Sequence, residues 1–200
     1  MKTFIKSIRL TLVMCVFLAV FYVFVLWIFA RVAGPNKGNA AVATKDGNVV
    51  GAVNVGQAFT KDIYFWGRPS CAGSGYDATK SSGSNKGPTN KAYLNEVNNR
   101  IVVFLKYHPY LRRKDIPAEM VTASGSGLDP DISQESAYIQ VRRIAMARGC
   151  GEQTVKAIVD KSLERPFLGM FGPEKINVLK LNMELDKSLD SKIDTKKQID

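Results

Sequence analysis

The chain has 200 residues and a formal net charge of +10, with 28 lysines and arginines against 18 acidic residues. This length allows one compact domain beyond a targeting or membrane segment. A single histidine and three cysteines exclude a histidine-rich metal centre and a dense disulfide framework. The basic surplus is compatible with lipid headgroups or an acidic partner protein, whereas the sequence shows no nucleic-acid-binding motif.

Residues 10–30 form an uncharged, apolar run near the N-terminus. At about 1.5 Å rise per residue, this run is roughly 31 Å long as a helix, which matches one bilayer core. The run therefore predicts a single transmembrane helix. A cleaved signal peptide is the alternative, but its apolar region is only about 7–15 residues long, and residues 30–33 offer a poor cleavage site.

The charges that flank this run predict its orientation. Lys2, Lys6 and Arg9 precede it, whereas only Arg31 and Lys37 follow closely. Because basic residues favour the cytoplasmic side, we expect residues 1–9 in the cytoplasm and the bulk of the chain outside it. The chain would then be a single-pass protein of the inner membrane, with residues 31–48 as a linker.

Residues 49–186 are predicted to form a single mixed domain of the α+β class. Within it, residues 49–55 and the aromatic run 63–66 favour strands. Residues 73–90 are rich in Ser, Gly, Asn and Lys and predict a long loop without an element of its own. Cys71 and Cys150 would both face an oxidising compartment, and the sequence leaves open whether they pair.

Helical periodicity begins after Asn90, a suitable N-cap, and ends before Pro109. The apolar face of this predicted helix is formed by Leu94, Val97, Ile101 and Phe104. Residues 120–123 then predict a short strand that leads into a Ser-Gly-Ser-Gly turn.

A second helix is expected between the N-cap Ser133 and the stop Gly149, with Arg148 extending to solvent. A third helix is predicted over residues 152–163. Near Ile176 the pattern favours a strand that turns into a helix. The last residues, 187–200, are predicted to form a polar tail that frays. The list of expected elements contains no internal repeat.

The residues that would support independent catalysis are missing from the sequence. The lone His108 is expected at the surface or at a cap, and the serines lack an obvious histidine base. Residues 84–89 superficially resemble a phosphate loop, but Lys86 precedes Gly87 and Pro88 interrupts the pattern. We therefore predict no catalytic residue, no cofactor-binding residue and no metal ligand in this chain.

Two polar segments, residues 64–90 and 121–130, require another interpretation. They either form ordered turns or present side chains to a partner protein. Tryptophan and arginine are residue types that dominate interface energetics. The predicted partner-docking residues are Trp66, Arg68, Asn85, Lys86, Ser124, Ser126 and Asp129.

Residues 64–70, 83–90 and 121–133, together with the N-terminal apolar run and residues 176–182, closely resemble the KdpC family. This family is the C subunit of the bacterial potassium-transporting P-type ATPase. The resemblance covers almost the whole chain. Asp131 departs from the family pattern, which often has a histidine after Asp-Pro.

The resemblance implies a noncatalytic accessory subunit of an ATP-driven, high-affinity potassium importer. The implied partners are a channel-like potassium-binding subunit, a P-type ATPase subunit and a small single-span peptide, and the complex would use ATP, magnesium and potassium. In the family, the C subunit has been assigned a chaperone role that raises the ATP affinity of the hydrolysing subunit. The predicted topology fits assembly or gating of the ion entrance better. The alternative is a stand-alone, membrane-anchored extracytoplasmic binding protein or enzyme.

Overall fold

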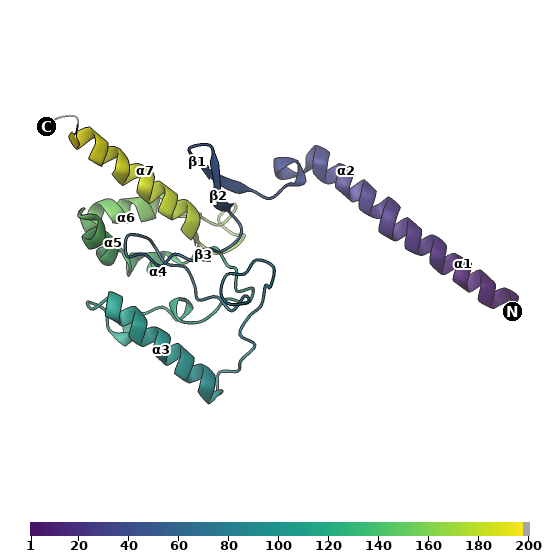
Figure 1. Cartoon of the computed structure of the whole chain (residues 1–200), viewed down its shortest axis with the longest axis horizontal. Helices are drawn as coiled ribbons and strands as arrows, with labels where there is room; N and C mark the ends of the chain where they lie inside the picture. Colours follow the sequence, from purple (N-terminus) through teal and green to yellow (C-terminus); the bar gives the residue numbers. More distant parts are fainter. Residues whose placement is uncertain (198–200) are drawn as a thin grey trace. The chain divides into compact units, whose positions relative to one another are not determined.

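The computed structural model describes residues 1–197 and divides into two compact units, Met1–Ala41 and Val42–Asp200. In the first unit (Figure 1), α1 (Lys2–Val16) and α2 (Val23–Ala33) are joined by a π-helical segment, Phe17–Tyr22. The resulting helix is long and apolar enough to cross a membrane. It contains the span predicted at residues 10–30 and extends beyond it at both ends.

The second unit begins with an antiparallel hairpin of β1 (Val42–Lys45) and β2 (Asn48–Ala52). Asp46 and Gly47, which connect the strands, have φ values of 51° and 80°. Positive φ at both central residues is the geometry in which an Asp-Gly pair closes a tight hairpin. The strand predicted at residues 49–55 is thus confirmed in part, whereas β1 lies in the segment predicted to be a linker.

The strand predicted at residues 63–66 is wrong, because side-chain amides take the place of a neighbouring strand. Asn182 accepts from the Phe65 amide at 2.8 Å and donates to the Phe65 carbonyl at 3.0 Å. Gln140 makes the same pair of contacts with Trp66, at 2.8 and 3.2 Å. The extended backbone is therefore fully paired at these two residues without belonging to a sheet.

The strand predicted at residues 120–123 is also wrong. Residues Ala118–Met120 form a 3₁₀ turn, and the Val121 amide donates back to the Ala118 carbonyl at 3.1 Å. A second 3₁₀ turn covers Arg113–Asp115. Because of these two turns, the residues before the Ser-Gly-Ser-Gly segment are compact rather than extended.

The helices follow the sequence pattern more closely. Asn90 caps α3 (Lys91–Tyr107) by accepting from the Tyr93 amide at 3.1 Å. On the predicted face of α3, Ile101 and Phe104 are buried but Leu94 is 50% exposed. Ser133 caps the next helix, which Gln140 divides in two, and Gly149 ends it at φ 64°. The remaining elements are β3 (Asp131–Ile132), α4 (Gln134–Tyr138), α5 (Val141–Arg148), α6 (Glu152–Lys161), β4 (Ile176–Asn177) and α7 (Val178–Lys197).

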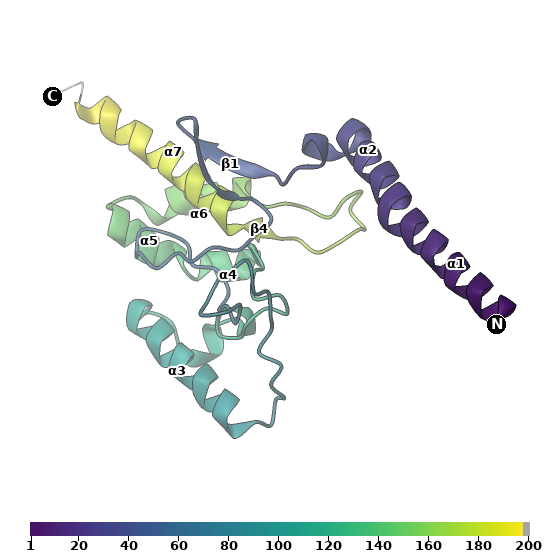
Figure 2. The same cartoon turned by 45° about the vertical axis from the view of Figure 1, so that its right-hand side comes forward.

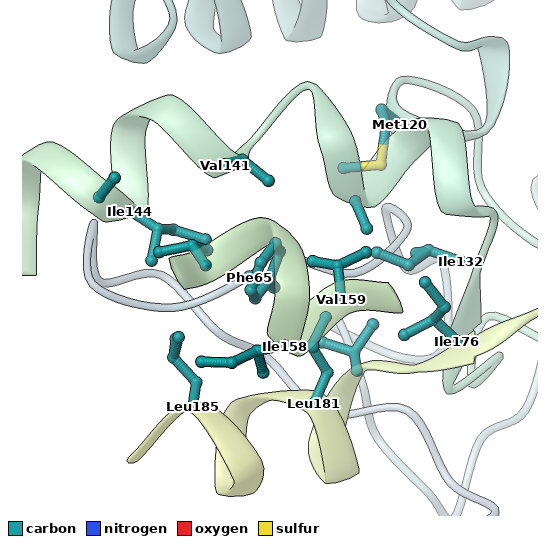
Figure 3. Packing of buried hydrophobic residues seen from close by; sticks show 14 of the residues in the cluster. Phe65, Met120, Ile132, Val141, Ile144, Ile158, Val159, Ile176, Leu181 and Leu185 are labelled. Atoms are coloured by element: carbon teal, nitrogen blue, oxygen red, sulfur yellow. The ribbon is translucent and has the colours of Figure 1, made fainter. Parts of the chain in front are cut away.

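Residues 53–90, between β2 and α3, contain no helix or strand, and we call them the irregular segment. The core of the second unit lies between α5, α6 and α7, and Phe65 of the irregular segment packs into it (Figure 3). The short strands β3 and β4 pair antiparallel and contribute Ile132 and Ile176. In Figures 1 and 2, α3 lies on the opposite side of the α4–α6 layer from α7. The α7 helix continues to Lys197, so the polar tail predicted from residue 187 is helical over most of its length, and residues 198–200 lie outside the described residues.

Two expectations about single residues are corrected by burial. The Arg148 side chain is 9% exposed and pairs with Asp186 at 2.6 Å, instead of extending to solvent. His108 is completely buried rather than at the surface, but it is the C-cap of α3, so the expected position at a cap is confirmed. Within the described residues, Cys15, Cys71 and Cys150 are all free, so Cys71 and Cys150 do not pair.

Candidate functional site

The two polar segments meet in space. The Ser126 carbonyl accepts from the Ser82 amide at 2.9 Å and from the Ser81 hydroxyl at 3.0 Å. The Ser70 hydroxyl donates to the Gly127 carbonyl at 2.6 Å and accepts from the Tyr76 amide at 2.7 Å. We call residues 68–77, 81–83 and 124–131 the polar loop cluster.

Gly127 is the point at which the segments approach most closely. Its φ is 67°, and a Cβ there would lie 2.5 Å from the Ser82 carbonyl oxygen and 2.7 Å from the Ala72 nitrogen. Both neighbours are backbone atoms, which cannot rotate away as a side chain can. The cluster therefore requires glycine at this position, both for its backbone conformation and for space.

An ion pair connects the two sides of the polar loop cluster. Arg68 contacts Asp129 at 3.0 Å, with 24% and 30% of their side chains exposed. Asp129 also accepts from the Asp131 amide at 3.1 Å, as expected of a residue that caps the following turn. The Tyr76 hydroxyl donates to the Arg68 carbonyl. Burial, aided by the charge of Asp129, raises the pKa of Tyr76, so this hydroxyl stays protonated and remains a donor.

The two serines predicted as docking residues lie in the polar loop cluster but face different surroundings. Ser124 is 3% exposed, and its hydroxyl has no hydrogen-bond partner among the described residues. The Ser126 hydroxyl accepts from the Leu128 amide at 3.1 Å, which closes the turn around Gly127. The Ser126 side chain therefore orders the loop, whereas the Ser124 hydroxyl makes no hydrogen bond among the described residues and is buried away from the surface.

Trp66 forms one wall of an apolar groove beside the polar loop cluster. The groove has a volume of about 490 Å³. The indole ring packs edge-on against Tyr107 at 5.1 Å and His108 at 5.6 Å between ring centroids, and its nitrogen donates to the Lys61 carbonyl at 3.1 Å. The groove is lined by residues from the irregular segment and from α3, among them Phe59, Trp66, Arg68, Arg100, Val103 and Tyr107. Trp66 and Arg68 thus share one surface.

Asn85 and Lys86 lie outside the polar loop cluster. Lys86 pairs with Glu96 on α3. Asn85 is exposed and has a φ of 51°, which asparagine tolerates better than most residues. The structure therefore brings Trp66, Arg68, Ser124, Ser126 and Asp129 together and leaves Asn85 and Lys86 near the start of α3.

His108 and Arg143 form a buried pair beside Trp66 that the sequence pattern did not indicate. Arg143 is 5% exposed, donates from Nε to His108 Nε2 at 2.9 Å, and lies 4.2 Å above the Trp66 ring. His108 Nδ1 is 2.8 Å from the Phe104 carbonyl. Burial lowers the pKa of His108 to about 4 and that of Arg143 to about 10. His108 is therefore neutral and Arg143 is charged near pH 7. Both side chains pack against the Trp66 ring, Arg143 as a cation over its face.

A metal ion in a protein requires a set of several donor side chains. Among the residues that the structure describes, no group of three or more His, Cys, Asp or Glu side chains could hold a metal ion. The buried histidine already uses both ring nitrogens in contacts with Phe104 and Arg143. The polar side chains of the cluster mainly order the loops, and the exposed feature that remains is the groove.

The fold and the site together define a membrane-associated chain with one candidate span and a mixed α+β unit that carries an ordered polar surface. A family model described as "KdpC: K+-transporting ATPase, c chain" matches residues 4–187. The chain belongs to the KdpC family, and it is thus a C subunit of the potassium-transporting ATPase.

Relatives of this family cover nearly the whole chain. A protein named potassium-transporting ATPase KdpC subunit from Phocaeicola vulgatus is 70% identical over 188 residues, which are 94% of this chain and 100% of the relative. The equivalent protein of Bacteroides thetaiotaomicron is 69% identical over the same shares. That of Flavobacterium johnsoniae is 46% identical over 94% of this chain and 99% of its own.

Proposed function

We propose that this chain is a noncatalytic accessory subunit that supports assembly of an ATP-driven potassium importer, with Val42–Asp200 outside the cytoplasm. The observation that carries the proposal is the surface on which Trp66 and Arg68 line an apolar groove of about 490 Å³, held in place by the polar loop cluster. An aromatic–arginine pair on a preordered surface is the composition of an interface hot spot.

The partners in this proposal are a channel-like potassium-binding subunit, a P-type ATPase subunit and a small single-span peptide. ATP, magnesium and potassium would be used by the assembled complex and not by this chain. The bias of basic residues before the apolar run supports the orientation in the inner membrane. An effect on ATP affinity would then act over a distance, because the nucleotide site of a P-type subunit faces the cytoplasm.

The test compares assembly and turnover in the same variants. Trp66→Ala and Arg68→Ala should lower recovery of the complex after affinity purification through another subunit. A lost hot spot costs about 2 kcal/mol, or roughly a thirtyfold loss of affinity. Arg112→Ala is the matched control, because the Arg112 side chain is 73% exposed and contacts the nearby Asp115 in a surface ion pair.

Potassium-stimulated ATPase activity per assembled complex should change little in these variants. Normal assembly with an altered potassium or ATP dependence would contradict the assembly role and favour the chaperone role instead. Trp66→Phe is a second variant that changes the groove but keeps an aromatic ring beside Tyr107 and His108. A loss of assembly in this variant would therefore come from the altered groove and not from a disrupted fold.

A further inference from the structure

The segment between α6 and β4 is a hairpin with an apolar tip, drawn in yellow-green in Figure 2, where it projects away from helices α4–α7. Its tip carries large apolar side chains that the rest of the second unit leaves exposed. Phe167, Leu168, Met170 and Phe171 are 72%, 71%, 75% and 63% exposed. Contiguous apolar exposure of this kind marks a contact site, whereas single exposed apolar residues are normal.

Backbone hydrogen bonds close the hairpin at its base and at its tip. At its base, Glu164 and Lys175 exchange two backbone hydrogen bonds of 2.9 and 3.1 Å. Lys175 also contacts Asp131 at 2.7 Å, and Lys180 contacts Glu164 at 2.6 Å. These ion pairs attach the base to β3 and α7. The tip is therefore held away from the core by specific contacts, and its exposure is built into the fold.

The chemistry of the tip matches a hydrocarbon environment. Residues 166–173 contain no charged and no polar side chain. The amides of Phe167, Gly169, Met170 and Phe171 all donate within the tip, at 3.0 to 3.2 Å. These internal bonds satisfy four backbone amides of the tip, which lowers the cost of placing it against lipid. A protein interface carries about one hydrogen bond per 100–200 Å², and this tip has no side chain to supply one.

A short connection joins the candidate membrane span to the second unit. The helix Lys2–Ala33 is of membrane-spanning length, and β1 begins at Val42. Residues 34–41 reach at most about 28 Å when fully extended. We propose that the tip Phe167–Phe171 inserts into the lipid bilayer as a second membrane contact, which fixes how the second unit faces the membrane. This inference needs the membrane span but not the assembly role.

A spin label reports directly on the surroundings of the tip. The full-length chain, with Cys15→Ala, Cys71→Ser and Cys150→Ala, would carry a label at Met170→Cys in vesicles of phosphatidylcholine and phosphatidylglycerol. Met146→Cys is the matched control, because Met146 is a methionine of the same unit that is 72% exposed. Collision with oxygen reports lipid, and collision with a water-soluble nickel chelate reports water.

The ratio of oxygen to nickel collision should be several-fold higher at position 170 than at position 146. Equal ratios, both typical of water, would overturn the proposal. The same labels are then measured in the purified complex in lipid nanodiscs. A tip label that is shielded from both reagents there is covered by another subunit, which also overturns it, whereas a persistent lipid signature supports it. A label at Leu168→Cys repeats the measurement if the first label disturbs the turn.

Discussion

Acidification should destabilise the second unit through His108. The imidazole is completely buried, stacks on Phe104 at 4.1 Å between ring centroids, and has its two nitrogens beside the Phe104 carbonyl and the Arg143 guanidinium. Burial first, and then the positive charge of Arg143, lower its pKa from 6.5 to about 4. The contact with the Phe104 carbonyl, and then the charge of Asp62, offset part of this lowering of the pKa, and Tyr110 is the other titratable neighbour.

The direction of the effect follows from proton binding. Below pH 6.5 the histidine of the unfolded chain binds a proton, whereas buried His108 stays neutral down to about pH 4. The contribution of neutral His108 to the free energy of unfolding is therefore fully present above pH 6.5, and it is lost as the pH falls from 6.5 towards 4. Between pH 8 and pH 5 the loss is about 2 kcal/mol, from 1.36 kcal/mol per pH unit below 6.5.

Carboxylates contribute at lower pH. Burial raises the pKa of Asp186, but hydrogen bonds from Arg148 and Lys45 outweigh that and lower it overall from 3.8. Its contribution is present above the unfolded pKa of 3.8 and is lost as the pH falls through the lower folded value. The change in unfolding free energy between pH 6.5 and pH 5 therefore comes mainly from His108.

The assay is urea unfolding of the full chain in detergent, followed by the fluorescence of Trp66, whose ring lies 5.6 Å from His108. Trp27→Phe leaves Trp66 as the remaining tryptophan of the two. The His108→Gln variant can still accept from Arg143 but does not titrate, so its unfolding free energy should vary less between pH 8 and pH 5 by about 2 kcal/mol. Equal pH dependence of the two proteins would refute this reasoning, whatever their absolute stabilities.

The sequence predicted the helices well because their signals are local. Asn90, Ser133 and Gly149 act within one turn of the helix ends that they define. The Asp-Gly pair of the first hairpin is an equally local signal that the linker prediction overlooked. The transition from strand to helix near Ile176 was also predicted, because apolar alternation changes its period there.

The errors concern contacts between distant residues. The run at residues 63–66 has strand composition, but amides more than 70 positions away satisfy its backbone. The burial of His108 depends on Arg143 in the same way. For the site, the sequence indicated the two polar segments and Trp66, Arg68 and Asp129, but not that the segments meet at Gly127 or that a groove lies beside them.

Three further changes test these long-range contacts. Gly127→Ala should lower the free energy of unfolding by more than the roughly 1–2 kcal/mol expected for a left-handed residue, because its Cβ would meet the backbone of Ser82 and Ala72. Gly149→Ala is the control: its φ is 64° and its Cβ would meet open space, so thermal unfolding should show a loss of only that amount. Asp186→Asn should destabilise by about 2 kcal/mol, since it weakens the contacts with Arg148 at 2.6 Å and Lys45 at 3.3 Å, and the difference should shrink in an Arg148→Met background. Asn182→Leu is the sharpest of the three. It keeps an apolar side chain of similar size in the core but leaves the buried Phe65 amide and carbonyl without their partner, at a cost of about 1–3 kcal/mol. Hydrogen exchange at the Phe65 amide should accelerate while that of Trp66, held by Gln140, stays slow. Unchanged protection of Phe65 in this variant would show that Asn182 does not replace a neighbouring strand.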